Sequence, residues 1–166
     1  MIFETKRLLV AQWKAGDLEA LYELFNDPAI KDSIVPQLTI EETTQIFKCQ
    51  LNEYDSRFPF GRYFIIEKKS GNIIGLFLLK ENKGEIEIGY SLKKEHWNQG
   101  YATEIVQGSI DWLLAINTFS KIYAVTETDN TSSQHVLLKS GFMQQENLIE
   151  NGKEMSLFRL LLKVDR

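Results

Sequence analysis

The sequence predicts a mixed α/β fold in which helices cover the faces of a sheet. Segments with apolar residues at alternate positions are interleaved with segments whose apolar residues repeat every three and four positions, and this alternation is typical of strands and helices that share one core. The chain of 166 residues is 43% hydrophobic and contains ten Phe, six Tyr and three Trp. It shows no repeat, linker or break in composition, so we expect a single domain spanning residues 1–166.

The first part of the chain predicts one strand and two helices. The strand covers residues 7–12, and a helix follows over 16–26, with Asp17 as its N-cap and Asp27-Pro28 as its end. A second helix fits 39–54, because Thr39 and Glu42 have the spacing of a capping box. Residues 58–61 read as a loop.

Three strands are expected next, over residues 63–67, 73–79 and 85–92. The first two are joined by 68–72, where Gly71 and Asn72 suit a tight hairpin. In the third strand, isoleucines and Tyr90 alternate with glutamates and Gly89, as on a strand with two unlike faces.

The period changes to that of an amphipathic helix over residues 101–116. A strand over 121–126 and a helix over 130–140 follow; Asn130 or Thr131 is placed to cap this helix, and Gly141 suits its C′ position. Two final strands surround a turn at 151–152. Taken in order, these elements imply a mixed sheet with helices on its faces.

Composition restricts the classes of partner. The net charge is −4 and the pI about 5.3, and no sustained run of Lys and Arg is present, which disfavours nucleic acid. Cys49 is the only cysteine, and the two histidines have no metal-ligand spacing, so we expect no disulfide and no metal site. No segment resembles a signal peptide or a membrane span, and we expect a cytoplasmic protein without a membrane partner.

The segment from Ser91 to Glu104 carries the chemistry. A strand runs into a polar loop and then into a helix whose first turn contains Gly100 and Ala102. The first turn of a helix presents unpaired N–H groups to an anion such as a pyrophosphate. The segment lacks the Gly-Lys-Ser/Thr end of a P-loop and the three glycines of a dinucleotide fingerprint. An ordinary glycine turn is the alternative interpretation.

Residues 86–92 followed by Trp97-Asn98-Gln99-Gly100-Tyr101-Ala102-Thr103-Glu104 resemble the acetyl-CoA region of the GNAT superfamily of N-acetyltransferases. The form Trp-x-x-Gly-Tyr-Ala-Thr-Glu is similar to the RimJ/RimL branch, which acetylates ribosomal-protein N-termini. Residues 5–10 resemble the opening strand of that branch, and residues 130–133 with 138–142 resemble its N-x-x-S…K-x-G-F signature. The resemblance covers nearly the whole chain and implies a GNAT-like fold, whose central mixed sheet is mostly antiparallel and flanked by helices.

The resemblance also implies a cofactor site for acetyl-CoA. Tyr90, Ser91 and Leu92 would offer backbone groups to the pantetheine arm, and Asn130 would bond to it. The pyrophosphate would be held by the amides of one run: Asn98, Gln99, Gly100, Tyr101, Ala102 and Thr103. Ser133 would lie near the thioester sulfur. The sequence departs from the wider superfamily in having Trp97 where Arg or Gln is common, which bears on the branch and not on the cofactor.

Acyl transfer to an amine by direct attack in a ternary complex needs a base and a proton donor for the leaving thiolate. Many relatives use a Tyr as donor where this chain has Leu137, so Ser133 becomes the candidate. Glu87 is the leading candidate base and Glu85 the second; the alternative is that both are exposed strand residues.

Other functions remain open at this stage. The acceptor is a protein N-terminus or a small amine such as a polyamine or an antibiotic. The net negative charge of the protein favours a cationic acceptor. A CoA-binding sensor without turnover and a structural protein with a fortuitous glycine loop are the rivals. A homodimer is expected from the resemblance.

Overall fold

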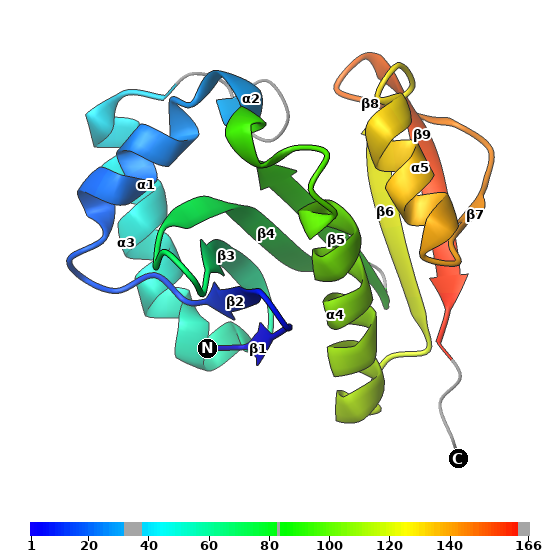
Figure 1. Cartoon of the computed structure of the whole chain (residues 1–166), viewed down its shortest axis with the longest axis horizontal. Helices are drawn as coiled ribbons and strands as arrows, with labels where there is room; N and C mark the ends of the chain where they lie inside the picture. The colour runs from blue at the N-terminus through cyan, green and yellow to red at the C-terminus, as the bar shows by residue number, and fades with distance from the viewer. Residues whose placement is uncertain (32–37, 83, 163–166) are drawn as a thin grey trace. The chain divides into compact units, whose positions relative to one another are not determined.

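The computed structural model describes residues 1–31, 38–82 and 84–162 (Figure 1). These residues group into two compact units, the first made of 1–79 with 90–101 and the second of 80–89 with 102–166. Three elements run through both units: β4 (Ile73–Asn82), β5 (Glu85–Leu92) and α4 (Tyr101–Ile116).

The sheet of the first unit is antiparallel. Strands β1 (Phe3–Glu4), β2 (Leu8–Ala11) and β3 (Gly61–Glu67) follow one another, and β4 pairs with β3. The β3–β4 register shifts between Ile65 and Ile66. The fully buried side chains of these strands are large and apolar, which supplies the driving force for packing; they include Leu8, Tyr63, Phe64, Ile65, Ile74, Leu76 and Phe77.

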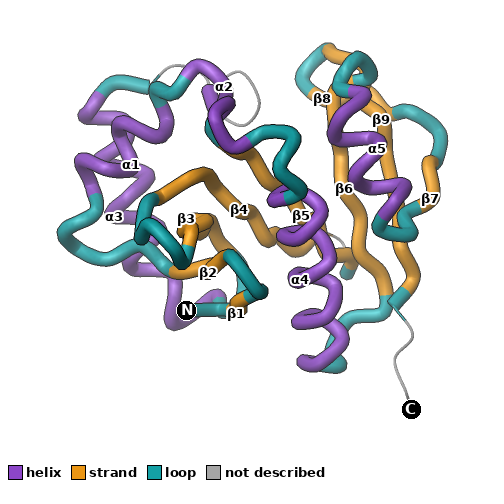
Figure 2. Tube along the Cα trace, in the orientation of Figure 1, coloured by secondary structure: helices purple, strands orange, loops and turns teal. Residues whose placement is uncertain are grey.

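Three helices complete the first unit: α1 (Leu18–Phe25), α2 (Pro28–Lys31) and α3 (Ile40–Arg57), drawn in purple in Figure 2. Helices α1 and α3 pack against each other. Trp13, which follows β2, ties this layer to the sheet, because its ring stacks on Phe47 of α3 and also contacts Phe25 and Phe64.

In the second unit, β5 runs parallel to β6 (Lys121–Glu127), with Ile86 opposite Ile122 and Glu87 opposite Tyr123. β6 pairs along its whole length with the antiparallel β9 (Lys153–Leu161). Two short strands, β7 (Met143–Gln144) and β8 (Leu148–Glu150), also pair with β9. Helix α5 (Thr131–Lys139) packs on β6.

The predicted order of helices and strands is confirmed, with the exact bounds of α4 and β5. The short elements β1, α2 and β7 were not predicted, because two to four residues carry too little periodicity to detect. α3 extends three residues beyond its expected end, and Gly61 begins β3 instead of lying in a loop. β4 continues to Asn82, and β6 ends one residue late.

Helix capping was predicted more closely than helix length. Thr39 and Glu42 form the expected capping box on α3, and the Asn130 side chain caps α5. Asp17 is the N-cap residue of α1, but its carboxylate makes no cap bond; Oδ2 accepts from the Lys14 N–H at 2.8 Å instead. Gly141 lies at C′ of α5 with φ 90°. None of the helices in the described residues combines the length and hydropathy of a bilayer span.

Candidate active site

The loop between β5 and α4 lies in the first unit and is held by its own side chains. A 3₁₀ turn, Lys94–His96, follows the strand, and residues 97–100 lead into Tyr101, the first residue of α4. The indole Nε1–H of Trp97 donates to the Leu92 carbonyl at 2.7 Å. The Gln99 side chain donates to the Glu95 carbonyl, also at 2.7 Å.

The backbone of this loop turns twice through the left-handed region. Asn98 has φ 58° and Gly100 has φ 78°. Only glycine adopts such angles without steric cost, and Asn tolerates them better than most residues. Loop residues 97–100 are exposed to solvent. The cradle expected from the sequence, where a phosphate would reach the amides at the start of a helix, stays a prediction.

Arg7 reaches the loop from a position 92 residues earlier in the chain. Its Nη1 donates to the Gln99 carbonyl at 3.0 Å, and its Nη2 lies 3.5 Å from the point where a Cβ on Gly100 would sit. The guanidinium carbon is 4.2 Å from the centre of the Tyr101 ring, a cation–π distance.

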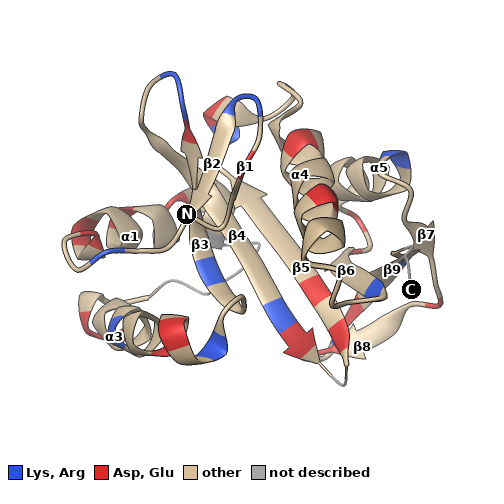
Figure 3. Cartoon of the chain, turned by 90° about the horizontal axis from the view of Figure 1, so that it is seen from below, with Lys and Arg blue, Asp and Glu red and all other residues tan. Residues whose placement is uncertain are grey.

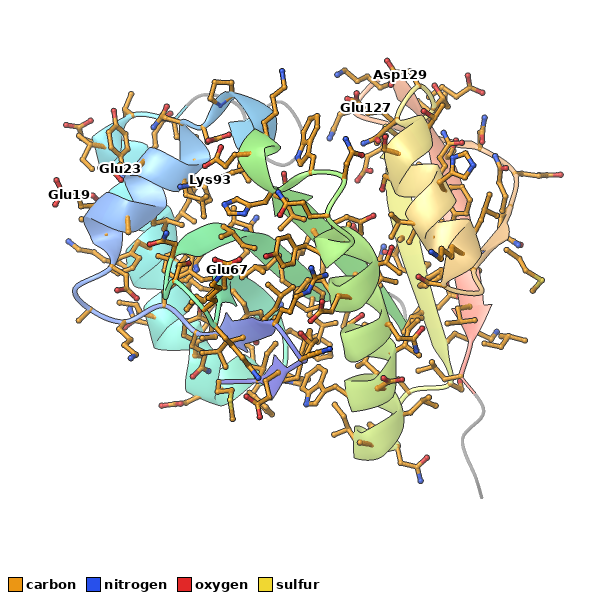
Figure 4. All side chains as sticks on the ribbon, in the orientation of Figure 1. Glu19, Glu23, Glu67, Lys93, Glu127 and Asp129 are labelled. Carbon is orange, nitrogen blue, oxygen red and sulfur yellow. The ribbon has the colours of Figure 1, made fainter. Side chains whose placement is uncertain are left out.

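Tyr101 is buried and fixes the start of α4 within the first unit. Its hydroxyl donates a short hydrogen bond to Oε1 of Glu67, the last residue of β3, which is labelled in Figure 4. Ser70 donates to the other carboxylate oxygen at 2.7 Å. Hydrogen bonds from Ser70 and Tyr101 lower the pKa of Glu67, since they stabilise its ionised form.

The end of β5, from Tyr90 to Leu92, lies against β4 in the same unit. The Ser91 carbonyl would be 2.1 Å from a Cβ at Gly75, so this position has no room for a side chain. The Lys93 N–H donates to the Ile74 carbonyl at 2.9 Å. Ser91 and Leu92 are buried, while Tyr90 is half-buried. The strand predicted to guide the pantetheine arm is therefore held tightly along one edge.

A second polar group lies in the other unit and is centred on Glu87. Oε2 of Glu87 accepts from the Tyr123 hydroxyl at 2.9 Å and lies 3.4 Å from Nζ of Lys80. Asn82 donates to the same tyrosine oxygen at 3.2 Å. Burial raises the pKa of Tyr123 to about 12, so this hydroxyl is a stable donor at neutral pH. The charged positions on β4 and β5 are coloured in Figure 3.

Glu85 forms a separate ion pair. Its Oε2 lies 3.2 Å from Nε of Arg159 on β9. The side chain of Glu85 is 26% exposed and that of Glu87 is 17% exposed, so the interpretation of both as freely solvated strand residues is wrong. The reason is the cross-strand basic partner of each carboxylate, which the sequence alone does not place.

Asn130 and Ser133 lie at the N-terminus of α5 in the second unit. Oδ1 of Asn130 accepts from the Ser133 N–H at 3.0 Å, which fixes the orientation of the Asn130 amide. Ser133 is half-buried. Glu127 at the end of β6 and Asp129 precede this helix (Figure 4), and Glu127 pairs with Lys153 at 3.1 Å.

The sequence pattern of the acetyltransferase (GNAT) domain family matches residues 7–143. The chain belongs to this family. As a GNAT N-acetyltransferase, it is a transferase that uses acetyl-CoA as its cosubstrate. The fold expected from the sequence, a mixed and mainly antiparallel sheet flanked by helices, is confirmed.

Individual relatives are similar over most of their length. An N-acetyltransferase of unassigned substrate from Bacillus licheniformis, p20, is 28% identical over 152 residues, covering 89% of this chain and 84% of that protein. Among solved structures, RimL, a ribosomal L7/L12 α-N-protein acetyltransferase in complex with coenzyme A, has a TM-score of 0.81 at 15% identity and covers 97% of both chains. Spermidine N-acetyltransferase from Vibrio cholerae, solved with CoA and spermine, has a TM-score of 0.78 at 22% identity, with 95% and 97% covered.

The structure brings in residues that the sequence did not single out. Arg7 contacts the loop at Gln99, and Glu67 contacts Tyr101 at the start of α4. Tyr123 and Lys80 both contact Glu87, the candidate base. The contacts of Arg7, Glu67 and Tyr123 join residues far apart in sequence, so no local spacing signals them, whereas Lys80 and Glu87 lie on consecutive strands. The nearest signal is the strand register, because Glu87 and Tyr123 are direct partners in parallel strands.

Proposed function

We propose that this GNAT enzyme transfers the acetyl group of acetyl-CoA to the α-amino group of a protein or peptide, by direct attack of the amine in a ternary complex. The observation that carries the proposal is the exposed turn at Asn98 and Gly100, which leads into the first turn of α4. An exposed run of amides at a helix start suits a diphosphate, and acetyl-CoA carries one.

The proposed cofactor contacts follow the chain. The amides of residues 98–103 would bind the pyrophosphate, and backbone groups of residues 90–92 would bind the pantetheine arm. The cap bond of Asn130 engages its oxygen and leaves the amide nitrogen as the proposed donor to the pantetheine. The hydroxyl of Ser133 would donate a hydrogen bond to the departing sulfur, because the usual tyrosine is replaced by Leu137.

Glu87 is the proposed base, directly or through a water, with Glu85 second. Glu87 is the less exposed of the two, and a hydroxyl and an ammonium group hold its carboxylate in one orientation. Glu85 is engaged by Arg159, a permanent cation that competes for its lone pairs.

Protein N-termini are the favoured acceptor because the motif of residues 97–104 resembles the RimJ/RimL branch and the fold is similar to that of RimL. A physical argument points the same way. An α-amino group has a pKa of about 8, whereas an alkyl ammonium has a pKa of about 10, so more of the α-amine is neutral at pH 7.

A polyamine is the second candidate. The net charge of −4 favours a cationic acceptor, and the fold is similar to that of a spermidine N-acetyltransferase. We also propose that each chain is a single catalytic domain, residues 1–166, and that the protein is a cytoplasmic homodimer, as the resemblance to the RimJ/RimL branch implies.

The deciding experiment measures CoA release from acetyl-CoA with a panel of acceptors. The panel contains peptides with free Ser or Ala N-termini, the same peptides with a blocked N-terminus, spermidine and an aminoglycoside. Release with free peptides but not with blocked ones supports the proposal, and release with spermidine alone favours the second candidate. CoA binding, seen as a raised melting midpoint, without release from any acceptor would point to a sensor.

A further inference from the structure

The side chain of Arg7 contacts the peptide group that joins Gln99 to Gly100. Nη1 donates to the carbonyl oxygen of Gln99 at 3.0 Å. That carbonyl belongs to the same planar unit as the N–H of Gly100, and the peptide is trans. In a trans peptide the C=O and N–H bonds point in opposite directions. A donor that holds the Gln99 carbonyl therefore turns the Gly100 N–H away from the guanidinium.

From this geometry we infer that Arg7 is a positioning residue that aims the Gly100 amide at the pyrophosphate of acetyl-CoA. The inference rests on the proposed cofactor site. Trp97, the first residue of the family motif, is engaged elsewhere, because its indole N–H donates to the Leu92 carbonyl.

Two further contacts restrict the guanidinium to this position. It lies over the ring of Tyr101, and the Tyr101 hydroxyl is bound to the Glu67 carboxylate. Tyr101 is buried, so the ring is a fixed surface on which the guanidinium plane rests. Strand β3, the turn after it and the start of α4 thus all determine where Arg7 lies.

The chemistry of the contact adds to its geometry. A hydrogen bond from a charged donor is stronger than a neutral one, and it polarises the peptide it binds. The N–H on the other side of that peptide becomes a better donor. Arg7 therefore both directs and strengthens the amide that the Gly100 turn presents.

The test compares Arg7→Gln with Lys6→Gln, a matched control. Lys6 is the exposed neighbour of Arg7, so both variants lose one positive charge at nearly the same place in the chain. Two quantities are measured on each protein: the Kd for CoA by calorimetry, and the position of the Gly100 amide resonance in a ¹⁵N-correlated spectrum before CoA is added.

We expect Arg7→Gln to raise the Kd for CoA roughly 10- to 150-fold, which is the range for loss of one charge-assisted hydrogen bond. We also expect it to move the Gly100 resonance, whereas Lys6→Gln changes neither. A raised Kd with an unmoved Gly100 resonance overturns the inference, since Arg7 would then act by charge alone. An unchanged Kd overturns it as well.

Three further outcomes are separable. If Arg7→Gln does not fold, Arg7→Lys replaces it; a raised Kd and a shifted Gly100 resonance support the inference, and wild-type values of both overturn it. If the wild-type protein does not bind CoA, the proposed function itself fails and the inference with it. If the wild type binds CoA and the Arg7 variants match Lys6→Gln in both the Kd and the Gly100 resonance, the proposed function stands and the role of Arg7 does not.

Discussion

Glu87 and Tyr123 face each other as register partners on two parallel strands, and the tyrosine hydroxyl donates to the glutamate at 2.9 Å. Lys80 approaches the same carboxylate oxygen. The carboxylate is therefore held by two donors while remaining 17% exposed, which suits a group that must both keep its orientation and exchange a proton.

Replacement of this carboxylate tests the proposed base. We expect Glu87→Gln to lower kcat by about a hundredfold or more, the usual contribution of a positioned acid or base, with little change in the Kd for CoA. Glu85→Gln is the matched control and should change kcat by less than about threefold. If the two variants exchange these phenotypes, Glu85 is the base; steady-state rates with a peptide acceptor decide.

Two glycine variants, one in the left-handed turn at Gly100, distinguish the effect of backbone strain from the loss of cofactor binding. Gly100→Ala places a Cβ at φ 78°, which costs about 1–2 kcal/mol of folding stability, and the altered turn should weaken CoA binding. Gly71→Ala carries the same strain at φ 74° in the β3–β4 turn, with open space around it. We expect Gly71→Ala to lose stability in urea denaturation and to keep its CoA affinity. Equal CoA affinity in both variants would contradict the cradle.

Asn130 has two proposed roles that different substitutions separate. Asn130→Asp keeps an oxygen that caps the Ser133 N–H, so stability should be retained, but it loses the amide donor and should bind CoA more weakly. Asn130→Ala should lose both the affinity and about 1 kcal/mol of stability. Thermal melts and calorimetry measure the two effects. Wild-type affinity in Asn130→Asp would exclude the proposed pantetheine contact.

The capping box of α3 makes a measurable contribution to stability. Thr39→Ala removes the bond to the Glu42 N–H at 3.2 Å and should destabilise the protein by about 1 kcal/mol. Thr44 lies in the same helix, and its hydroxyl bonds to the Ile40 carbonyl. Such a bond within a helix adds little, so Thr44→Ala should be neutral within about 0.5 kcal/mol. Chemical denaturation compares the two variants.

Three tyrosines make the protein sensitive to alkaline pH. Burial raises the pKa of Tyr54 and Tyr63, and it raises that of Tyr123 to about 12, from the ordinary value of 10.0. Above about pH 10 the unfolded chain releases these protons while the folded state keeps them. The contribution of the tyrosines to folding stability is therefore complete below about pH 10 and is lost as pH rises toward 12. Denaturation midpoints should fall over this interval, and Tyr123→Phe should reduce the fall. A flat profile would contradict the burial of these hydroxyls.

The sequence by itself determined the elements whose evidence is local. The bounds of α4 and β5 follow from periodicity over sixteen and eight residues. The caps at Thr39 and Asn130 follow from side chains that bond to amides three residues away. The anion cradle at Gly100 stays a prediction, because an ordinary glycine turn before a helix has the same local sequence.

Only the tertiary structure decided which distant side chains meet these elements. Arg7 reaches the loop across 92 residues, and Tyr123 meets Glu87 across 36, through contacts that depend on how the chain folds within each unit. Strand pairing and helix packing set such contacts, and neither leaves a periodic trace in the chain. The sequence therefore predicted which backbone would meet the cofactor, and the fold decided which side chains contact that backbone and the candidate base.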